Sequence, residues 1–246
     1  MSELPYHCEF GKLDADQWHS LLCEFDDATV DQTQAFAHAR WPSAEVETVQ
    51  LRLHDEILAA AQVVIFYVPG LGARLAYIKF GPMWRRRGQP ENLPALRAIL
   101  RGIRSEYCKR RGLLLRIYPA SYENSSDSMA PIISAERFGN SDNKLSFDRP
   151  LRFVMDLTPS EEVLHAGLKA KWRYNLRRTE RHSLNIFKRE DATAAESFME
   201  LYRSMLVRKH FHDDSAVDVF PSFHAALPSD LRPTIVECQH RGETLA

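Results

Sequence analysis

The densest group of side chains able to bind an anion lies at residues 169–181. Six of these residues are basic and one, Glu180, is acidic. Arg173, Arg177 and Arg181 are spaced i, i+4, i+8, so on a helix they share one face. Apolar residues recur every four positions on another face: Leu164, Leu168, Trp172 and Leu176. The pattern predicts an amphipathic helix whose basic face is either simply solvated or an anion-binding surface.

Capping residues mark the start of this helix. Thr158 is a good N-cap, Pro159 suits the first helical position, and Glu161 stands where a capping box places a carboxylate. We therefore expect one helix over residues 158–182, with the side of Leu164, Leu168 and Trp172 buried.

A second set of candidate residues lies in a short helix predicted at residues 31–40. Gln32, Phe36 and Arg40 recur every four residues and so are expected to share a face. Arginine can hold a phosphate group with two parallel hydrogen bonds. The alternative is that Arg40 only complements the negative end of the helix dipole.

A third set lies at the end of a predicted strand. Tyr77 and Lys79 point to one face of this strand and Ile78 points to the other. Lys79 is either a ligand to an anion or a charge that protects a sheet edge. Gly81, just after the strand, would allow the backbone to approach a ligand closely.

Charge is strongly segregated along the 246-residue chain although its net charge is only −1. Residues 1–60 carry 3 basic and 12 acidic groups, whereas residues 61–120 carry 12 basic and 2 acidic groups. This asymmetry predicts a basic working surface inside a chain that is nearly neutral overall.

Other features narrow the class of protein. Four cysteines lie far apart, which favours reduced thiols over a disulfide framework or a zinc site. The run His210-Phe211-His212-Asp213-Asp214 is read as a polar loop, and we expect no metal. No signal peptide is recognisable, and the longest apolar stretch, residues 57–68, is too short to span a bilayer. We expect a cytoplasmic protein.

Periodicity predicts an α/β (α+β) fold with a mixed, mostly antiparallel sheet flanked by helices. The first part reads as two helices, three antiparallel strands, a helix and a strand. Their predicted limits are 14–25, 31–40, 46–53, 57–68, 73–80, 93–111 and 113–118. Residues 121–157 form a connecting segment.

The same order then begins again. Strands are predicted at 183–189 and 232–240, with helices at 192–208 and 216–226 between them. The turns around His54 and His240 occupy equivalent places in this internal repeat. We therefore predict a first domain at 1–157, a basic connecting helix at 158–182 and a second, incomplete domain at 183–246, and we expect a longer native protein.

Three groups of residues give the chain a resemblance to a known family. They are Asp156-Leu157-Thr158, then Ser160-Glu161-Glu162, then Lys171-Trp172-Arg173-Tyr174-Asn175-Leu176-Arg177-Arg178. The segment resembles the helix that leads into the second half of the FemAB family. Those enzymes add amino acids to the peptide stem of peptidoglycan precursors, and each consists of two domains that look like GNAT acyltransferases.

The resemblance extends to the other candidates. Gln32, Phe36 and Arg40 match a family pattern of Gln, Trp and a basic residue, the last implicated in holding the precursor diphosphate. Tyr77 to Pro82 resembles a Tyr-x-x-x-Gly-Pro strand end that borders the precursor site. The resemblance thus implies an aminoacyltransferase with an amine of a phosphorylated envelope precursor as acceptor and aminoacyl-tRNA as donor. The substrate-binding residues would be Gln32, Arg40, Tyr77, Lys79, Gly81, Arg173 and Arg177, with no cofactor beyond the co-substrate.

Two alternatives remain open. Arg85-x-x-Gly88-x-Pro90 partly matches the loop with which GNAT acetyltransferases hold the pyrophosphate of acetyl-CoA, although Pro90 removes a backbone donor. That match would make the chain an acyl-CoA-dependent N-acyltransferase linked to exopolysaccharide or envelope assembly. The basic helix with Arg173, Arg177 and Arg181 alone would suit a non-catalytic nucleic-acid-binding module. For the aminoacyltransferase, peripheral contact with a lipid-linked precursor is a further expected interaction. No general base can be named from the sequence.

Overall fold

The computed structural model describes residues 5–68, 70, 72–120, 132, 136, 138, 155–210 and 217–245. The chain divides into two compact units, Met1–Ser146 and Phe147–Ala246, and each is described by itself. Most of the predicted connecting segment at 121–157 lies outside the described residues. The predicted domain limits at 157 and 182 stay predictions.

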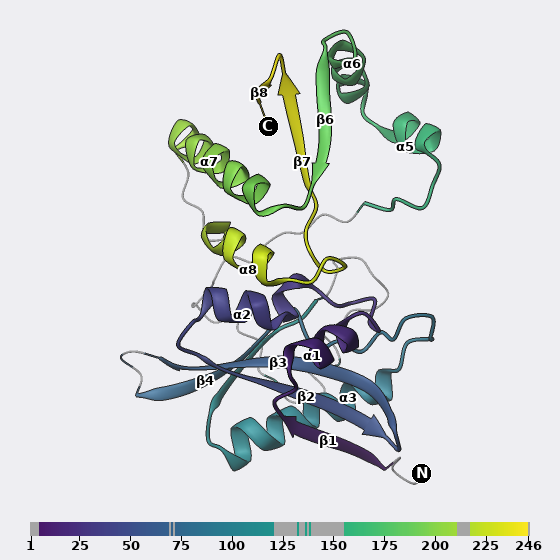
Figure 1. The fold of residues 1–246 in the computed structure, drawn as a ribbon. Helices are drawn as coiled ribbons and strands as arrows, with labels where there is room; N and C mark the ends of the chain where they lie inside the picture. Colours follow the sequence, from purple (N-terminus) through teal and green to yellow (C-terminus); the bar gives the residue numbers. More distant parts are fainter. Residues whose placement is uncertain are drawn as a thin grey trace. The chain divides into compact units, whose positions relative to one another are not determined.

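The first unit is built on a five-stranded mixed sheet (Figure 1). Its strands lie side by side in chain order: β1 (Tyr6–Gly11), β2 (Glu45–Leu53), β3 (Glu56–Val68), β4 (Ala73–Lys79) and β5 (Leu114–Tyr118). The first four strands pair antiparallel, and β5 pairs parallel with β4. The mixed, mostly antiparallel sheet is therefore confirmed.

Helices cover both faces of this sheet (Figure 1). On one face lie α1 (Ala15–Leu22), a 3₁₀ turn η1 (Val30–Gln32) and α2 (Gln34–Arg40); on the other lies α3 (Leu93–Ile103), which continues as a π-helical stretch η2 (Arg104–Arg110). The predicted apolar stripe of the long helix is confirmed, because all four of its residues are 0% exposed: Leu96, Leu100, Ile103 and Tyr107.

Strand β1 is absent from the predicted order. Its residues alternate between half-buried and exposed, with Cys8 and Phe10 packed against the core and Glu9 exposed. Gly102 of α3 faces this strand so closely that an added Cβ atom would lie 2.3 Å from Cys8 Sγ. Burial raises the pKa of the Cys8 thiol to about 11. The period-2 pattern of residues 6–10 was the signal that could have identified the strand.

The segregated charges of the sequence meet in space. Five cations of residues 61–120 form ion pairs with acids of residues 1–60: Arg74–Glu45, Lys79–Asp31, Arg86–Glu24, Arg87–Asp26 and Arg111–Glu47. The predicted basic working surface is therefore wrong for much of this segment. Sequence distance hid the pairing, because antiparallel strands and the returning helix bring the two halves of the unit together.

The second unit repeats the element order of the first. It contains α5 (Glu161–Gly167), α6 (Ala170–Thr179), β6 (Leu184–Arg189), α7 (Ala192–Lys209), a 3₁₀ turn η3 (Val217–Val219), α8 (Phe220–Ala226), β7 (Ile235–His240) and β8 (Glu243–Thr244). Strand β7 lies between β6 and β8, and both pairings are antiparallel.

The repeat extends to the register of the strands. In the first unit the first residue of β1, Tyr6, pairs with the last residue of β2, Leu53. In the second unit the first residue of β6, Leu184, pairs with the last residue of β7, His240. Each hairpin then turns through a residue of positive φ, 55° at His54 and 53° at Arg241. The predicted equivalence is thus confirmed with a shift of one residue, since His54 corresponds to Arg241.

The predicted single helix at 158–182 is wrong in two respects. Ser160, not Thr158, is the N-cap, and the helix breaks at Leu168, whose extended ψ of 145° separates α5 from α6. The predicted burial of Trp172 is also wrong, because the residue is 66% exposed. Regular spacing predicted an amphipathic helix but not the break that divides its apolar side.

We expect Trp172→Ala to change the free energy of unfolding by less than about 1 kcal/mol. A side chain that keeps most of its contact with water in the folded state contributes little transfer free energy, and exposed substitutions usually lie within about 0.5 kcal/mol. Urea denaturation followed by circular dichroism measures the change. A loss of about 3–5 kcal/mol, the range for a buried aromatic residue, would contradict the exposed position.

Candidate active site

The candidate site of the first unit lies at the end of β4. Tyr77 and Lys79 lie on the face that α2 covers, whereas Ile78 is 0% exposed on the opposite face against α3. The predicted division of these side chains between two faces is therefore confirmed. Arg116 of β5 pairs with Tyr77 in register, and its guanidinium lies 5.8 Å from the centre of the Tyr77 ring.

Aromatic side chains gather around Trp41, the residue that follows α2. The Trp41 ring centre lies 6.0 Å from that of Phe36, 6.3 Å from that of Phe66 and 5.9 Å from that of Tyr77. The contacts with Phe36 and Tyr77 are edge-to-face and that with Phe66 is stacked, which are favourable arrangements of aromatic pairs. Trp41 was not among the predicted site residues, and an aromatic residue just after a helix that ends in arginine was the available signal.

Cations border this aromatic cluster. Lys79 Nζ lies 2.8 Å from Asp31 Oδ1 and 4.8 Å from the centre of the Phe36 ring. The side chain of Lys79 is 24% exposed and that of Asp31 is 7% exposed, so the pair is only partly open to solvent. Arg40 is exposed at the C-terminal end of α2. The site therefore combines buried and half-buried rings with positive charge, a combination suited to a phosphorylated ligand.

The phenol of Tyr77 keeps its proton in this environment. Burial raises its pKa above the ordinary value, and the nearby positive charge of Arg116 offsets part of that rise. Tyr77 is thus a neutral group that can donate a hydrogen bond.

Gln32 does not line the site, which corrects its predicted place beside a ligand. The chain leaves helical geometry at Thr33, whose ψ is 144°, so Gln32 belongs to η1 and does not share a helical face with Phe36 and Arg40. Gln32 is 1% exposed, and its carboxamide bonds to the backbone of Gln62 and Lys79. Gln32 therefore has a structural role, because it links the backbones of β3 and β4 next to the site.

Gly81 has a related structural role. A Cβ atom added to Gly81 would lie 3.0 Å from Gln32 Oε1 and 3.1 Å from Ile78 Cγ2. The group that approaches this glycine closely is therefore Gln32, and not a ligand as the sequence suggested.

The predicted residues of the second unit have two different environments. Arg173 Nη1 donates a hydrogen bond of 2.8 Å to Ala166 O and another to Leu168 O, so it bridges the break between α5 and α6. Arg177 is exposed on α6. Arg181 lies beyond the end of α6 at Thr179, which removes it from the predicted helical face.

The loop considered for acetyl-CoA is closed by contacts within the protein. Asp27 Oδ2 accepts from Trp84 N at 3.0 Å and Asp27 Oδ1 from Arg85 N at 3.2 Å, while Arg87 N donates to Glu24 O. The arginine side chains pair with acids: Arg85 with Glu91, Arg86 with Glu24 and Arg87 with Asp26. These groups hold the loop against the segment after α1.

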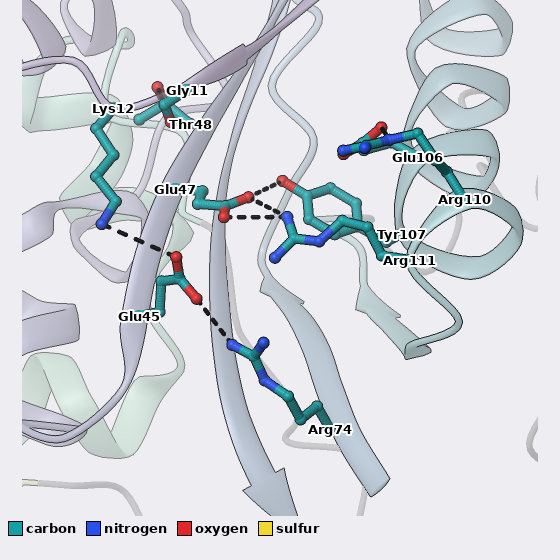
Figure 2. A network of polar contacts seen from close by, with 10 residues as sticks. All are labelled: Gly11, Lys12, Glu45, Glu47, Thr48, Arg74, Glu106, Tyr107, Arg110 and Arg111. Atoms are coloured by element: carbon teal, nitrogen blue, oxygen red, sulfur yellow. Dashed lines mark hydrogen bonds and ion pairs between the residues drawn. The ribbon is translucent and has the colours of Figure 1, made fainter.

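A hollow of about 210 Å³ lies elsewhere in the first unit, lined by Phe10, Gly11, Lys12, Glu47, Glu106, Arg110 and Arg111. Figure 2 shows its charged groups directed at one another. Glu47 accepts from the Tyr107 hydroxyl at 2.9 Å and from Arg111 at 2.7 Å and 3.0 Å. We interpret this network as a brace between β2 and the end of η2.

Among the described residues there is no group of three or more side chains suited to hold a metal ion. The predicted polar loop continues past His210 outside the described part of the chain. The helices that the structure describes include none that is long and apolar enough to cross a membrane.

Comparison with known proteins defines the class of fold. No family model matches the sequence, and no curated protein matches it. Among solved structures, FemX matches with a TM-score of 0.73 and 16% identity over 94% of this chain and 58% of the FemX chain. Two other matches are more distant. A probable acetyltransferase has a TM-score of 0.42 and 9% identity, over 61% of this chain and 99% of that chain. A putative acetyl transferase from Pyrococcus furiosus has a TM-score of 0.39 and 13% identity, over 59% of this chain and 99% of that chain.

The chain has a FemAB-like, GNAT-related fold, as the resemblance in its sequence implied. It is similar to FemX over almost its whole length, and it spans 58% of the FemX chain. At 16% identity this likeness establishes the fold alone.

Proposed function

We propose that this chain belongs to an acyl- or aminoacyltransferase that acts on an amine of a phosphorylated cell-envelope precursor. The observation that carries the proposal is the cationic and aromatic surface at the end of β4, formed by Trp41, Tyr77, Lys79 and Arg116, with Arg40 exposed just before Trp41. It lies on a fold shared with FemX. Aminoacyl-tRNA is the proposed donor.

The chemistry is attack of a neutral amine on an activated carbonyl carbon. A proton must leave the amine, and negative charge develops on the carbonyl oxygen. Binding of the diphosphate by cations orients the acceptor, and the half-buried rings exclude water from one side of it. We assign the residues of the first unit to binding and orientation.

The acyl-CoA alternative has less support. A pyrophosphate needs free backbone N–H groups at the loop before α3. The amides of Arg85 and Arg87 already donate to Asp27 and Glu24, and the side chains of this loop are ion-paired. The contacts at the loop therefore favour a precursor site at β4 over a CoA site.

We expect Arg40→Ala to weaken binding of a nucleotide-linked diphosphate precursor by about 1–3 kcal/mol, or roughly 5–150-fold, because one charge-assisted contact is lost. Isothermal titration calorimetry measures the affinity. Arg97→Ala is the matched control, since this side chain is 43% exposed on α3 against the other face of the sheet.

The melting temperature of Arg40→Ala should equal that of the parent protein, because the side chain is exposed. Equal affinities for the parent and the Arg40→Ala variant would refute the assignment. A thermal-shift screen with the precursor, CoA and tRNA then separates the three candidate functions, since a ligand stabilises the folded form that binds it.

We expect Arg177→Gln combined with Arg181→Gln to weaken tRNA binding and to flatten its dependence on salt. Each lost phosphate contact reduces the slope of log K against log salt by about 0.7–0.9. Arg173 is left unchanged because it bridges α5 and α6. Filter binding at several salt concentrations gives the slope, and an unchanged slope would remove these residues from the proposed tRNA surface.

A further inference from the structure

The pairing of β3 with β4 is interrupted beside the candidate site. Val64 pairs with Tyr77, and the next bridge further along joins Ala60 to Met83. Strand β3 advances four residues between these pairs while the facing chain advances six. The facing chain therefore bulges outward between Tyr77 and Met83.

The carboxamide of Gln32 fills the gap that this bulge opens. In continued register Gln62 would face Lys79, and its N–H would donate to the Lys79 carbonyl oxygen. Instead Gln62 N donates to Gln32 Oε1 at 2.8 Å, and Gln32 Nε2 donates to Lys79 O at 2.5 Å. Two hydrogen bonds of the Gln32 carboxamide thus replace the single direct backbone bond that would join β3 to β4 here.

The surrounding residues are suited to this insertion. Gly81 leaves room because it lacks a Cβ atom, which would lie 3.0 Å from Gln32 Oε1. Phe80 takes a positive φ of 51° where the chain turns out of the strand. The indole N–H of Trp18 donates to Gln32 O at 2.6 Å and anchors the residue at its backbone. Gln32 is thus held from both sides.

We infer that Gln32 is a positioning residue that sets the location of the Lys79 ammonium group. Gln32 binds the backbone of Lys79, and the preceding residue, Asp31, binds its side chain at 2.8 Å. Two consecutive residues of η1 therefore hold the two ends of Lys79. The use of that ammonium group for a phosphorylated ligand rests on the proposed function, whereas its location does not.

The test follows the Lys79 signals in the NMR spectrum of protein labelled with ¹³C-lysine. Because Nζ lies 4.8 Å from the Phe36 ring centre and 5.7 Å from that of Phe80, ring currents displace the neighbouring Hε signals. We expect Gln32→Met to abolish most of this displacement. Gln50→Met is the matched control, a glutamine 7% exposed on β2 that bonds to Arg52 and should leave the Lys79 signals in place.

Gly81→Ala provides a second variant if Gln32→Met does not fold, since the added methyl group, 3.0 Å from Gln32 Oε1, shifts the carboxamide and should reduce the displacement of the Lys79 signals. An unchanged Lys79 displacement in either folded variant, or an equal loss in Gln50→Met, would overturn the inference. Inorganic pyrophosphate is titrated in parallel. If Lys79→Met leaves its affinity unchanged, the proposed ligand contact fails while the ring-current result still decides the role of Gln32.

Discussion

Trp18→Ala is expected to lower the free energy of unfolding of the first unit by about 3–5 kcal/mol. Trp18 is 0% exposed, so its removal leaves a cavity between α1 and the sheet. It also leaves the carbonyl oxygen of Gln32 without the indole N–H that donates to it at 2.6 Å. Urea denaturation followed by tryptophan fluorescence and circular dichroism measures the loss.

Two further variants separate the causes of that loss. Trp18→Phe keeps most of the ring but not the N–H, so it should cost about 1–3 kcal/mol for an acceptor left buried without a donor. Trp172→Ala makes the same change as Trp18→Ala at a residue 66% exposed and should cost less than about 1 kcal/mol. Equal losses at Trp18 and Trp172 would contradict the burial on which the prediction depends.

Glu47→Ala is expected to lower the free energy of unfolding of the first unit by about 2–4 kcal/mol. The carboxylate of Glu47 is 12% exposed and accepts hydrogen bonds from Tyr107 and Arg111 (Figure 2). Its removal leaves a buried hydroxyl and a guanidinium that is 20% exposed without their partner. Breaking a buried pair from one side is costly because the other charge stays desolvated.

Glu45→Ala is the matched control on the same strand. The side chain of Glu45 is 37% exposed and forms an ion pair of 2.8 Å with Arg74, whose side chain is 47% exposed. Ion pairs between exposed groups contribute about 0–1 kcal/mol. Thermal unfolding of both variants compares them directly, and a Glu45→Ala variant as unstable as Glu47→Ala would show that burial of the Glu47 network is not what makes it stabilising.

The part of the fold that the sequence predicted is the part governed by local periodicity. Leu96, Leu100, Ile103 and Tyr107 keep a helical spacing, and burial of all four against the sheet followed from that spacing. The long apolar run at 57–68 became β3, which is buried over most of its length. The spacing of apolar residues depends only on residues close together in the sequence, so such helices and strands can be predicted without knowledge of the fold.

The breaks in helices were not predictable from the same signals. Thr33 and Leu168 interrupt segments whose side chains continue the helical spacing. At Thr33 the chain turns so that Gln32 can reach Gln62 on β3, a partner 30 residues away. Tertiary hydrogen bonds of this kind override local propensity and leave no trace in the spacing.

The candidate site was predicted only in part. Tyr77 and Lys79 were placed correctly on one strand face, because side chains alternate along a strand. Trp41, just after α2, joins them by a ring contact and Arg116 joins them by the pairing of β5 with β4, and neither contact can be read from the sequence. Gln32 was assigned to a ligand because buried glutamines and ligand-binding glutamines have the same local appearance in a sequence.

The order of synthesis also determines when the ion pairs between the first 60 residues and the next 60 can form. A ribosome releases the stretch of net charge −9 before the stretch of +10 appears. Glu47 meets Arg111 only after 64 further residues have been added, which takes roughly 3–13 s at about 5–20 residues per second. Glu47 therefore gains its two partners, Tyr107 and Arg111, only when the end of η2 has been made.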